Sequence, residues 1–289
     1  SVLRTILNEG DEVIIPSPTY MAYTSLLDLS GAKPVFLDTS DTDFIPSAER
    51  LEALITDKTK AIIFNYPSNP TGMTLSKDDT DKLVEVLAKH DIFILADEIY
   101  SENVFVGEHH SFAAYPEIKD RLFLVHGVSK SHSMTGWRVG YVLGPAELMQ
   151  YVSRIHSYNC VCASLPGQYA TVEALNNCRD IPEEMNVEYK RRRDYVYDRL
   201  QKMGLETVLP NGAFYIFPSI KKFGISSEEF CDRLLAEGGV AALAGSVFTD
   251  YGEGFIRISY SYAMSELEKG MDRLEKFVEK IEQEVSAKA

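Results

Sequence analysis

The stretch Val125–Gly140 reads VHGVSKSHSMTGWRVG, and the fold is inferred outward from it. It begins at the end of an apolar run, Leu122–Val125, that has the pattern of a buried strand. Lys130 follows in a small, polar loop, and Arg138 comes eight positions later. In open α/β sheets, ligands bind outside the carboxyl ends of the strands. This loop would therefore bring an amine and a guanidinium to a ligand site, although a lone lysine in such a loop is more often a surface residue.

Apolar runs alternate with amphipathic segments through the first 180 residues. The alternation of apolar strands with helices is typical of a mostly parallel sheet that is covered on both faces. The predicted fold class is therefore α/β, with a mostly parallel central sheet covered by helices. The predicted strands are 11–16, 34–37, 61–65, 91–96, 122–125 and 139–143, and the predicted helices are 1–8, 21–30, 47–55, 76–90 and 166–177.

The pattern changes near residue 181. A long charged helix is predicted over 183–203, and a polar helix of this kind can bridge two domains. Four of its residues form one stripe at helical spacing: Tyr189, Arg193, Val196 and Leu200. We expect a large domain over 1–180 and a smaller C-terminal α+β domain over 181–289. The small domain would contain short strands at 206–209, 214–217 and 255–260 and further helices at 226–237 and 265–284.

The composition argues against several kinds of partner. A net charge of −14 makes the chain a poor partner for nucleic acid or an anionic membrane. No apolar run approaches the roughly 18 residues of a membrane span. The four cysteines do not have the CxxC spacing of zinc or redox sites, so we expect no metal site and reduced thiols in a cytoplasmic protein.

Polar motifs follow three consecutive predicted strands: Asn69 in Asn-Pro-Thr-Gly, Asp97 and Tyr100 in Asp-Glu-Ile-Tyr, and Lys130 with Arg138. Taken singly, the Asn-Pro-Thr-Gly motif is explained by a turn. A buried Asp97 on its own is explained by a salt bridge to a lysine or an arginine. Together they suit one cofactor, pyridoxal phosphate. Its aldehyde bonds to a lysine, its pyridine nitrogen pairs with a carboxylate, and its phosphate suits an arginine fork.

With these residues in place, the chain resembles the class I/II aminotransferases, which are fold-type I pyridoxal-phosphate enzymes. The resemblance covers the chain from end to end, with the motifs in the family's order. The similar segments are NEGDEVIIPSPTY (8–20), NPTG (69–72), ADEIY (96–100), SKSHSMTGWRVGY (129–141), LPNGAFYIFP (209–218) and IRISY (256–260).

The resemblance implies a role for each matching residue. Lys130 would bond to the cofactor and later act as the general base, with Asp97 and Tyr100 as the other catalytic residues. Asp97 would pair with the pyridine nitrogen. Asn69 and Tyr100 would contact the phenolic oxygen of the cofactor, and Ser129 and Arg138 would contact its phosphate. Tyr20 would stack on the cofactor ring. Arg257 would bind the substrate carboxylate, with Asn69 beside it.

Other interpretations of these residues stay open. Tyr20 could be a surface anchor of its loop, and Arg257 could pair with a structural carboxylate. His126 and Trp137 are predicted to be packing residues. The family often has a serine where this chain has Gly127.

The implied activity is ping-pong transfer of an amino group between an amino acid and a 2-oxo acid, by a homodimer without nucleic-acid or membrane partners. A C–S β-lyase of the same fold uses the same lysine, aspartate and arginine and stays open, as does an inactive truncated chain. Family members carry about a hundred further residues upstream, including a turn whose amides bind phosphate. We therefore expect an incomplete phosphate site and an unpaired edge at strand 139–143.

Overall fold

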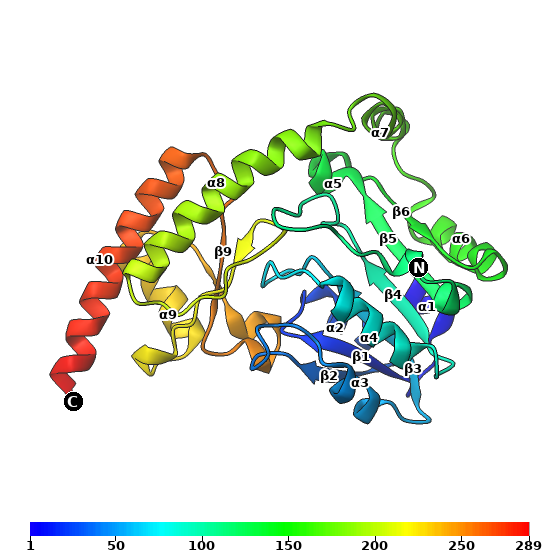
Figure 1. Cartoon of the computed structure of the whole chain (residues 1–289), viewed down its shortest axis with the longest axis horizontal. Helices are drawn as coiled ribbons and strands as arrows, with labels where there is room; N and C mark the ends of the chain where they lie inside the picture. Colours follow the sequence, from blue (N-terminus) through cyan, green and yellow to red (C-terminus); the bar gives the residue numbers. More distant parts are fainter. Residues whose placement is uncertain (289) are drawn as a thin grey trace.

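The computed structural model describes residues 1–288 and contains a large and a small sheet (Figure 1). The large sheet has the strand order β2-β1-β3-β4-β5-β6. All neighbouring strands are parallel except the pair β5 and β6. This confirms the mostly parallel sheet and places strand 140–143 at its edge. The strands are β1 (Glu12–Ser17), β2 (Lys33–Asp38), β3 (Thr59–Asn65), β4 (Phe93–Asp97), β5 (Leu122–Gly127) and β6 (Gly140–Leu143).

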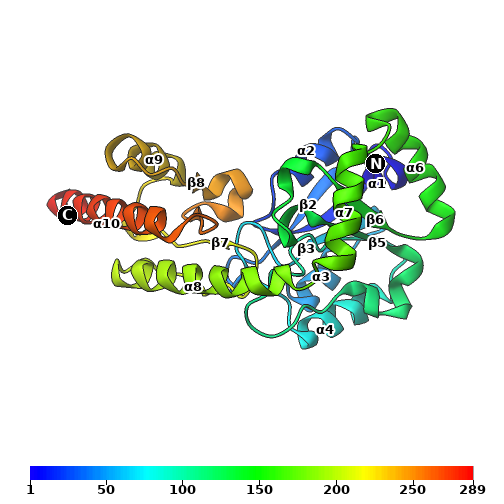
Figure 2. The ribbon, with the colours of Figure 1, turned by 90° about the horizontal axis from the view of Figure 1, so that it is seen from above.

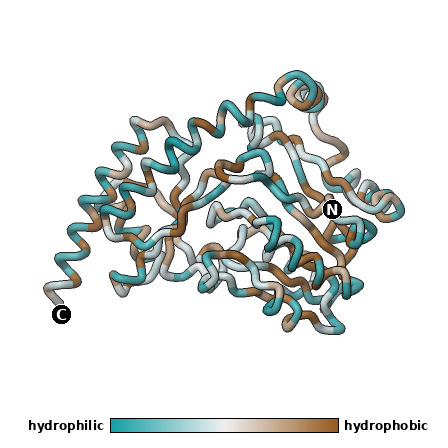
Figure 3. Tube along the Cα trace, in the orientation of Figure 1, coloured by the Kyte–Doolittle hydropathy of each residue, from teal (hydrophilic) through white to brown (hydrophobic). Residues whose placement is uncertain are grey.

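Helices cover both faces of the large sheet because its strands are apolar on both sides. Ile14 belongs to the cluster under α3 and α4, whereas Val13 and Ile15 belong to the cluster under α1, α2 and α6, as the alternation of side chains along a strand requires. Figure 3 shows hydrophobic residues gathered along these strands. The covering helices are α1 (Val2–Ile6), α2 (Ala22–Asp28), α3 (Ala48–Leu54), α4 (Lys77–Leu87) and α6 (Ala146–Cys160).

The small sheet is antiparallel, with the strand order β7-β9-β8. It packs with α8, α9 and α10 in a hydrophobic cluster of its own. Figure 2 shows α8 running from the large-sheet body to the small one, beside α10. The boundary between 180 and 181 stays a prediction. The elements are α8 (Ile181–Lys202), β7 (Tyr215–Ile216), α9 (Ser227–Arg233), β8 (Leu243–Ala244), β9 (Ile256–Ser259) and α10 (Met264–Lys288).

Most of the stripe predicted on the long helix, now α8, is buried. Arg193, Val196 and Leu200 are all buried, and the Arg193 guanidinium donates 2.9 Å to the carbonyl of Pro210. The remaining helical elements are α5 (Val128–Ser131), α7 (Leu165–Asn177), the 3-10 turns Phe112–Ala114, Pro116–Arg121, Thr135–Trp137, Lys221–Phe223, Gly245–Phe248 and Asp250–Gly252, and a π turn at Leu234–Gly238.

Two segments differ from the sequence-based expectation. The strand predicted at 206–209 is wrong, because this segment is an extended connection outside both sheets. Helix α6 was not predicted. Val152 is its one buried residue, with Leu148 and Met149 packed beside it, whereas Tyr151 and Tyr158 of the same helix are exposed. No helix within residues 1–288 is both long and apolar enough to cross a membrane.

Candidate active site

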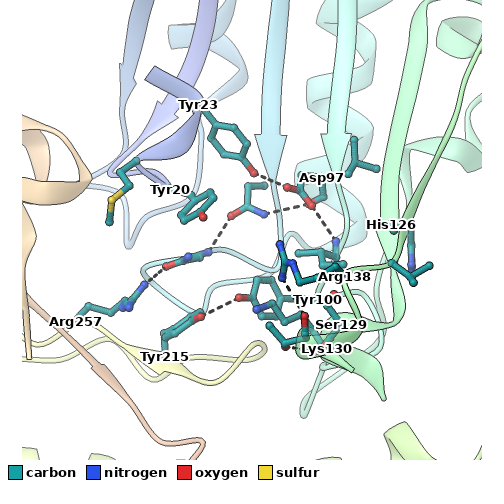
Figure 4. A pocket seen from close by; sticks show the side chains of 18 residues that line it. Tyr20, Tyr23, Asp97, Tyr100, His126, Ser129, Lys130, Arg138, Tyr215 and Arg257 are labelled. Atoms are coloured by element: carbon teal, nitrogen blue, oxygen red, sulfur yellow. Dashed lines mark hydrogen bonds between the residues drawn. The ribbon is translucent and has the colours of Figure 1, made fainter. Parts of the chain in front are cut away.

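The carboxyl ends of β3, β4 and β5 meet at one edge of the large sheet. Parallel pairing sets Asn65 beside Asp97 and Asp97 beside Val125, so the loops that follow these strands converge. A cavity of about 600 Å³ opens at this edge (Figure 4). All of the site residues predicted from the sequence line it: Tyr20, Asn69, Asp97, Tyr100, Ser129, Lys130, Arg138 and Arg257.

Asp97 ends β4 and presents its carboxylate to the cavity. Oδ2 accepts a 2.7 Å hydrogen bond from the Tyr23 hydroxyl, and Oδ1 accepts one of 3.2 Å from the Ile99 amide. Burial raises the pKa of Asp97, although the Tyr23 hydrogen bond opposes that rise. No Lys or Arg side chain in the described part of the chain forms a salt bridge with Asp97, so the salt-bridge interpretation of this residue is wrong.

Lys130 lies in α5, directly after β5. Its Nζ lies 5.6 Å from the ring centre of Tyr100 and 5.8 Å from that of Phe214. Burial lowers the pKa of Lys130, and the positive charges of Arg138 and Arg257 lower it further. An amine in this setting gives up its proton more readily than a surface lysine and is therefore a better nucleophile.

Arg257 reaches the cavity from β9 of the small sheet. Its Nη1 donates a 2.8 Å hydrogen bond to Oδ1 of Asn69, and its Nε is buried with no partner among residues 1–288. The guanidinium carbon lies 4.4 Å from the ring centre of Tyr215 and 5.0 Å from that of Phe248. Burial lowers the pKa of Arg257. The alternative of a structural carboxylate finds no such partner in the described residues.

Ser129, within α5, and Arg138, in the loop that follows α5, both lie at the cavity. Arg138 has a left-handed backbone (φ 57°) and uses its guanidinium for a 3.0 Å bond to the Thr135 carbonyl. Its side chain is otherwise exposed and can turn toward an anion. Gly127, just before α5, is tightly packed, since a Cβ there would lie 3.0 Å from the Cα of Gly140 and the backbone of β6 would have to give.

Two tyrosines of the site were not predicted. Tyr23 is buried and donates to Asp97, and Tyr215 is buried with its hydroxyl 3.0 Å from that of Tyr100. For Tyr23, the only signal in the sequence was its position three residues after Tyr20, at the start of a predicted helix. Tyr215 lies within the Asn-Gly-Ala-Phe-Tyr segment, whose likeness to the family was noted without a role for the tyrosine.

The two residues predicted to be packing residues differ. Trp137 is 49% exposed, so that prediction is wrong for this side chain. His126 stacks on Tyr141 and also lines the cavity. Its Nδ1 accepts from the Gly127 amide, which leaves the Nε2 hydrogen to donate 2.7 Å to Ser101. Tyr20 is 40% exposed, with its ring edge against Tyr23. Nowhere in residues 1–288 do three His, Cys, Asp or Glu side chains gather as a metal site would need.

This is an α/β fold with a lysine and three further charged side chains at one cavity, and the comparisons with known proteins identify the family. The family model described as aminotransferase class I and II matches residues 1–274. The chain is 46% identical to a probable N-acetyl-LL-diaminopimelate aminotransferase of Bacillus subtilis, over 96% of this chain and 70% of that protein. It is 41% identical to an aspartate aminotransferase of Pyrococcus abyssi, over 95% of this chain and 72% of that protein.

A solved structure agrees with these relatives. The aromatic aminotransferase from Pyrococcus horikoshii superposes with a TM-score of 0.94 at 39% identity, covering 98% of this chain and 76% of that one. The chain belongs to the class I and II aminotransferases, and the protein is an enzyme of that family. Members of the family generally use pyridoxal phosphate and act on amino acids and 2-oxo acids.

Proposed function

We propose that this chain binds pyridoxal phosphate at Lys130 and uses it to move an amino group between an amino acid and a 2-oxo acid. One observation carries the proposal. Asp97, Lys130, Arg138 and Arg257 all line one cavity, and none of the four forms a salt bridge with another described residue. A carboxylate and three cationic groups without ionic partners call for a ligand that has one positive centre and two anionic groups.

Pyridoxal phosphate bound with an amino acid fits this charge pattern. Its pyridine nitrogen supplies a cation for Asp97, and its phosphate supplies an anion for Arg138 and the Ser129 hydroxyl. The α-carboxylate of the substrate would take the unpartnered Nε of Arg257. Asn69 accepts from Arg257 through Oδ1, so its Nδ2 is free to donate to the phenolic oxygen beside Tyr100.

When bound, pyridoxal phosphate supplies an electron sink for the charge left at the α-carbon of the substrate. Asp97 sustains that sink, because a carboxylate beside the pyridine nitrogen keeps the nitrogen protonated. Tyr23 helps by holding the carboxylate in place and by favouring its charged form. Tyr20, at the cavity wall, is the aromatic side chain available to stack on the ring.

Lys130 would act twice. Its amine would bond to the aldehyde carbon of the cofactor with loss of water, and once the substrate amine has replaced it, the free amine would take the proton from the α-carbon. The lowered pKa of Lys130 suits both tasks, since each requires the neutral amine. Arg257 holds the carboxylate and thereby fixes the α-carbon within reach of that amine.

We also propose that the enzyme is a homodimer in the cytoplasm. The outer surface of α6, α7 and their connection supports a partner, because four large apolar side chains stand exposed there: Tyr158, Val161, Leu165 and Tyr169. The four cysteines are free thiols, in line with a reducing compartment.

The experiment is an amino-transfer assay with pyridoxal phosphate, a panel of amino acids and 2-oxoglutarate. The expected result is a new amino acid and a new 2-oxo acid in equal amounts, with ping-pong kinetics, and none from Lys130→Ala. By their names, the relatives reported above act on aspartate, aromatic amino acids and N-acetyl-LL-diaminopimelate, so these classes belong in the panel. Release of ammonia and pyruvate from cystathionine, without transfer, would instead establish the C–S β-lyase.

A further inference from the structure

The hydroxyl groups of Tyr100 and Tyr215 lie 3.0 Å apart across the boundary between the two sheets (Figure 4). Tyr100 follows β4 of the large sheet, whereas Tyr215 begins β7 of the small sheet. Both side chains are buried, and their rings meet edge to face at 5.9 Å. The chemistry proposed above uses Tyr100 and leaves Tyr215 without a role.

Tyr215 also contacts the arginine assigned to the substrate carboxylate. The guanidinium carbon of Arg257 lies 4.4 Å from the ring centre of Tyr215, which is close enough for a cation–π interaction. One side chain thus touches both Arg257 and Tyr100. A second connection runs from Arg257 to Asn69 through the 2.8 Å hydrogen bond.

Either hydroxyl could donate in this pair, and the cation over the Tyr215 ring favours donation from Tyr215. A guanidinium over the ring draws electron density toward itself and polarises the O–H bond of Tyr215, which makes this hydroxyl the better donor. Burial raises the pKa of Tyr100, which keeps its own hydroxyl protonated. With its oxygen accepting from Tyr215, the Tyr100 hydrogen is left to point into the cavity.

We propose that Tyr215 is a positioning residue, whose hydroxyl donates to Tyr100 and directs the Tyr100 hydrogen toward the phenolic oxygen of bound pyridoxal phosphate. The inference rests on the proposed function. Two hydrogen bonds in series polarise one another, so the Tyr100 donor is stronger with Tyr215 behind it. A substrate carboxylate bound to Arg257 would then change the hydrogen bonds to the phenolic oxygen of the cofactor by two routes, through this tyrosine pair and through Asn69.

The test is the pH dependence of the absorbance band given by the chain with pyridoxal phosphate on Lys130. A donor to the phenolic oxygen stabilises its anion, so it lowers the pH at which the bound group loses its proton. Tyr100→Phe should raise this midpoint. Tyr215→Phe, which keeps the ring on Arg257, should raise it by about 0.3–0.7 pH unit, a roughly two- to fivefold change in proton affinity.

The double variant Tyr100→Phe/Tyr215→Phe separates a relay from two independent effects. If Tyr215 acts through Tyr100, the double variant has the midpoint of Tyr100→Phe alone. The charged groups near Tyr100 are Asp97, Lys130 and Arg257, and all three are unchanged in these variants. An additive shift, or a Tyr215→Phe midpoint equal to that of the wild type, would overturn the proposal.

Tyr260→Phe is the matched control. Tyr260 is fully buried, and its hydroxyl donates at 3.5 Å to the carbonyl of Ala213, two residues before Tyr215. Loss of a buried hydroxyl there should leave the midpoint unchanged, so a shift equal to that of Tyr215→Phe would mark a structural effect and refute the positioning role. If the wild-type chain gives neither a band nor a borohydride-fixed adduct on Lys130, the proposed function and this inference are both overturned. If the wild-type adduct forms but Tyr215→Phe leaves the midpoint unshifted, the inference alone is refuted.

Discussion

The hydroxyl of Tyr23 donates a 2.7 Å hydrogen bond to Oδ2 of Asp97, and no cationic side chain among residues 1–288 neutralises that carboxylate. The raised pKa of Asp97, caused chiefly by burial, is the consequence in the cofactor-free chain. A protein that keeps a costly charge in this way is arranged for a ligand that brings the opposite charge.

Asp97→Asn should therefore stabilise the cofactor-free chain while it removes activity. The folded-state pKa of Asp97 lies above the unfolded value of 3.8, so the folded chain binds the proton more tightly and loses stability as the pH rises through that window. At pH 7 the neutral asparagine should raise stability by roughly 1 kcal/mol, or about 2 °C in Tm. Its amide can still donate to Tyr23 and accept from the Ile99 amide.

The same variant should lower kcat/KM by about 100-fold or more, because the pyridine nitrogen loses its ionic partner. Thermal unfolding of the cofactor-free chain at pH 7 and at pH 4 and steady-state kinetics of the loaded enzyme are the measurements. A destabilised Asp97→Asn chain at pH 7, or one with full activity, would contradict this account of the carboxylate.

Lys130 should react with pyridoxal phosphate at a lower pH than an ordinary lysine does. Only the neutral amine attacks, so the rate rises with pH through the pKa of Lys130, which burial and two arginines hold below 10.5. Arg257→Gln removes one of those charges and should move the midpoint upward. Arg273→Gln, an arginine bonded to the Gly239 carbonyl, is the control and should leave it in place. Stopped-flow absorbance gives the rates, and a wild-type midpoint at or above 10.5 would disprove the expectation.

Arg257→Lys should weaken the binding of every amino acid by its α-carboxylate. Lysine keeps the charge but loses the fork and the bond geometry, which is worth about 1.5–3 kcal/mol for a charged hydrogen bond and corresponds to roughly 10- to 150-fold in KM. Dissociation constants of unreactive monocarboxylates should weaken by the same factor. Unchanged carboxylate affinity would mean that the substrate lies elsewhere in the cavity.

Gly72 should tolerate no side chain, because it brings the Asn-Pro-Thr-Gly turn against the segment that carries Tyr215. Its φ is +74°, and a Cβ would lie 2.5 Å from both Pro210 Cβ and the Tyr215 carbonyl oxygen. Gly72→Ala should cost about 1–3 kcal/mol of unfolding free energy. Gly270→Ala in α10 has open space around it and should instead stabilise by up to about 1 kcal/mol. Chemical denaturation compares the two, and equal stability of both variants would refute the close approach.

The large sheet could be predicted from the sequence because its strands contain short apolar runs, such as 13–15 and 61–64, and these are a local signal. The segment 206–209 is not a strand because no neighbouring strand pairs with it, and local sequence does not reveal which segments will become neighbours. Helix α6 was missed because its apolar residues face outward as well as inward, so periodicity does not reveal it.

The candidate site divides along the same line. Asn69, Asp97 and Lys130 follow predicted strands, so the topology alone brings them together. Tyr215 comes from the small sheet, and its hydrogen bond to Tyr100 depends on how the two sheets face each other across the cavity. The bond from Tyr23 to Asp97 likewise joins residues 74 positions apart. Contacts of this kind arise from tertiary packing and leave no pattern in the local sequence.

The most direct test of the central claim is the covalent attachment of pyridoxal phosphate to Lys130. The chain is mixed with the cofactor, its absorbance is recorded, and borohydride fixes the product before peptide mass spectrometry. The account predicts a visible band and a reduced adduct on the peptide that contains Lys130, and neither in Lys130→Ala. An adduct spread equally over surface lysines, or a band that persists in Lys130→Ala, would contradict it.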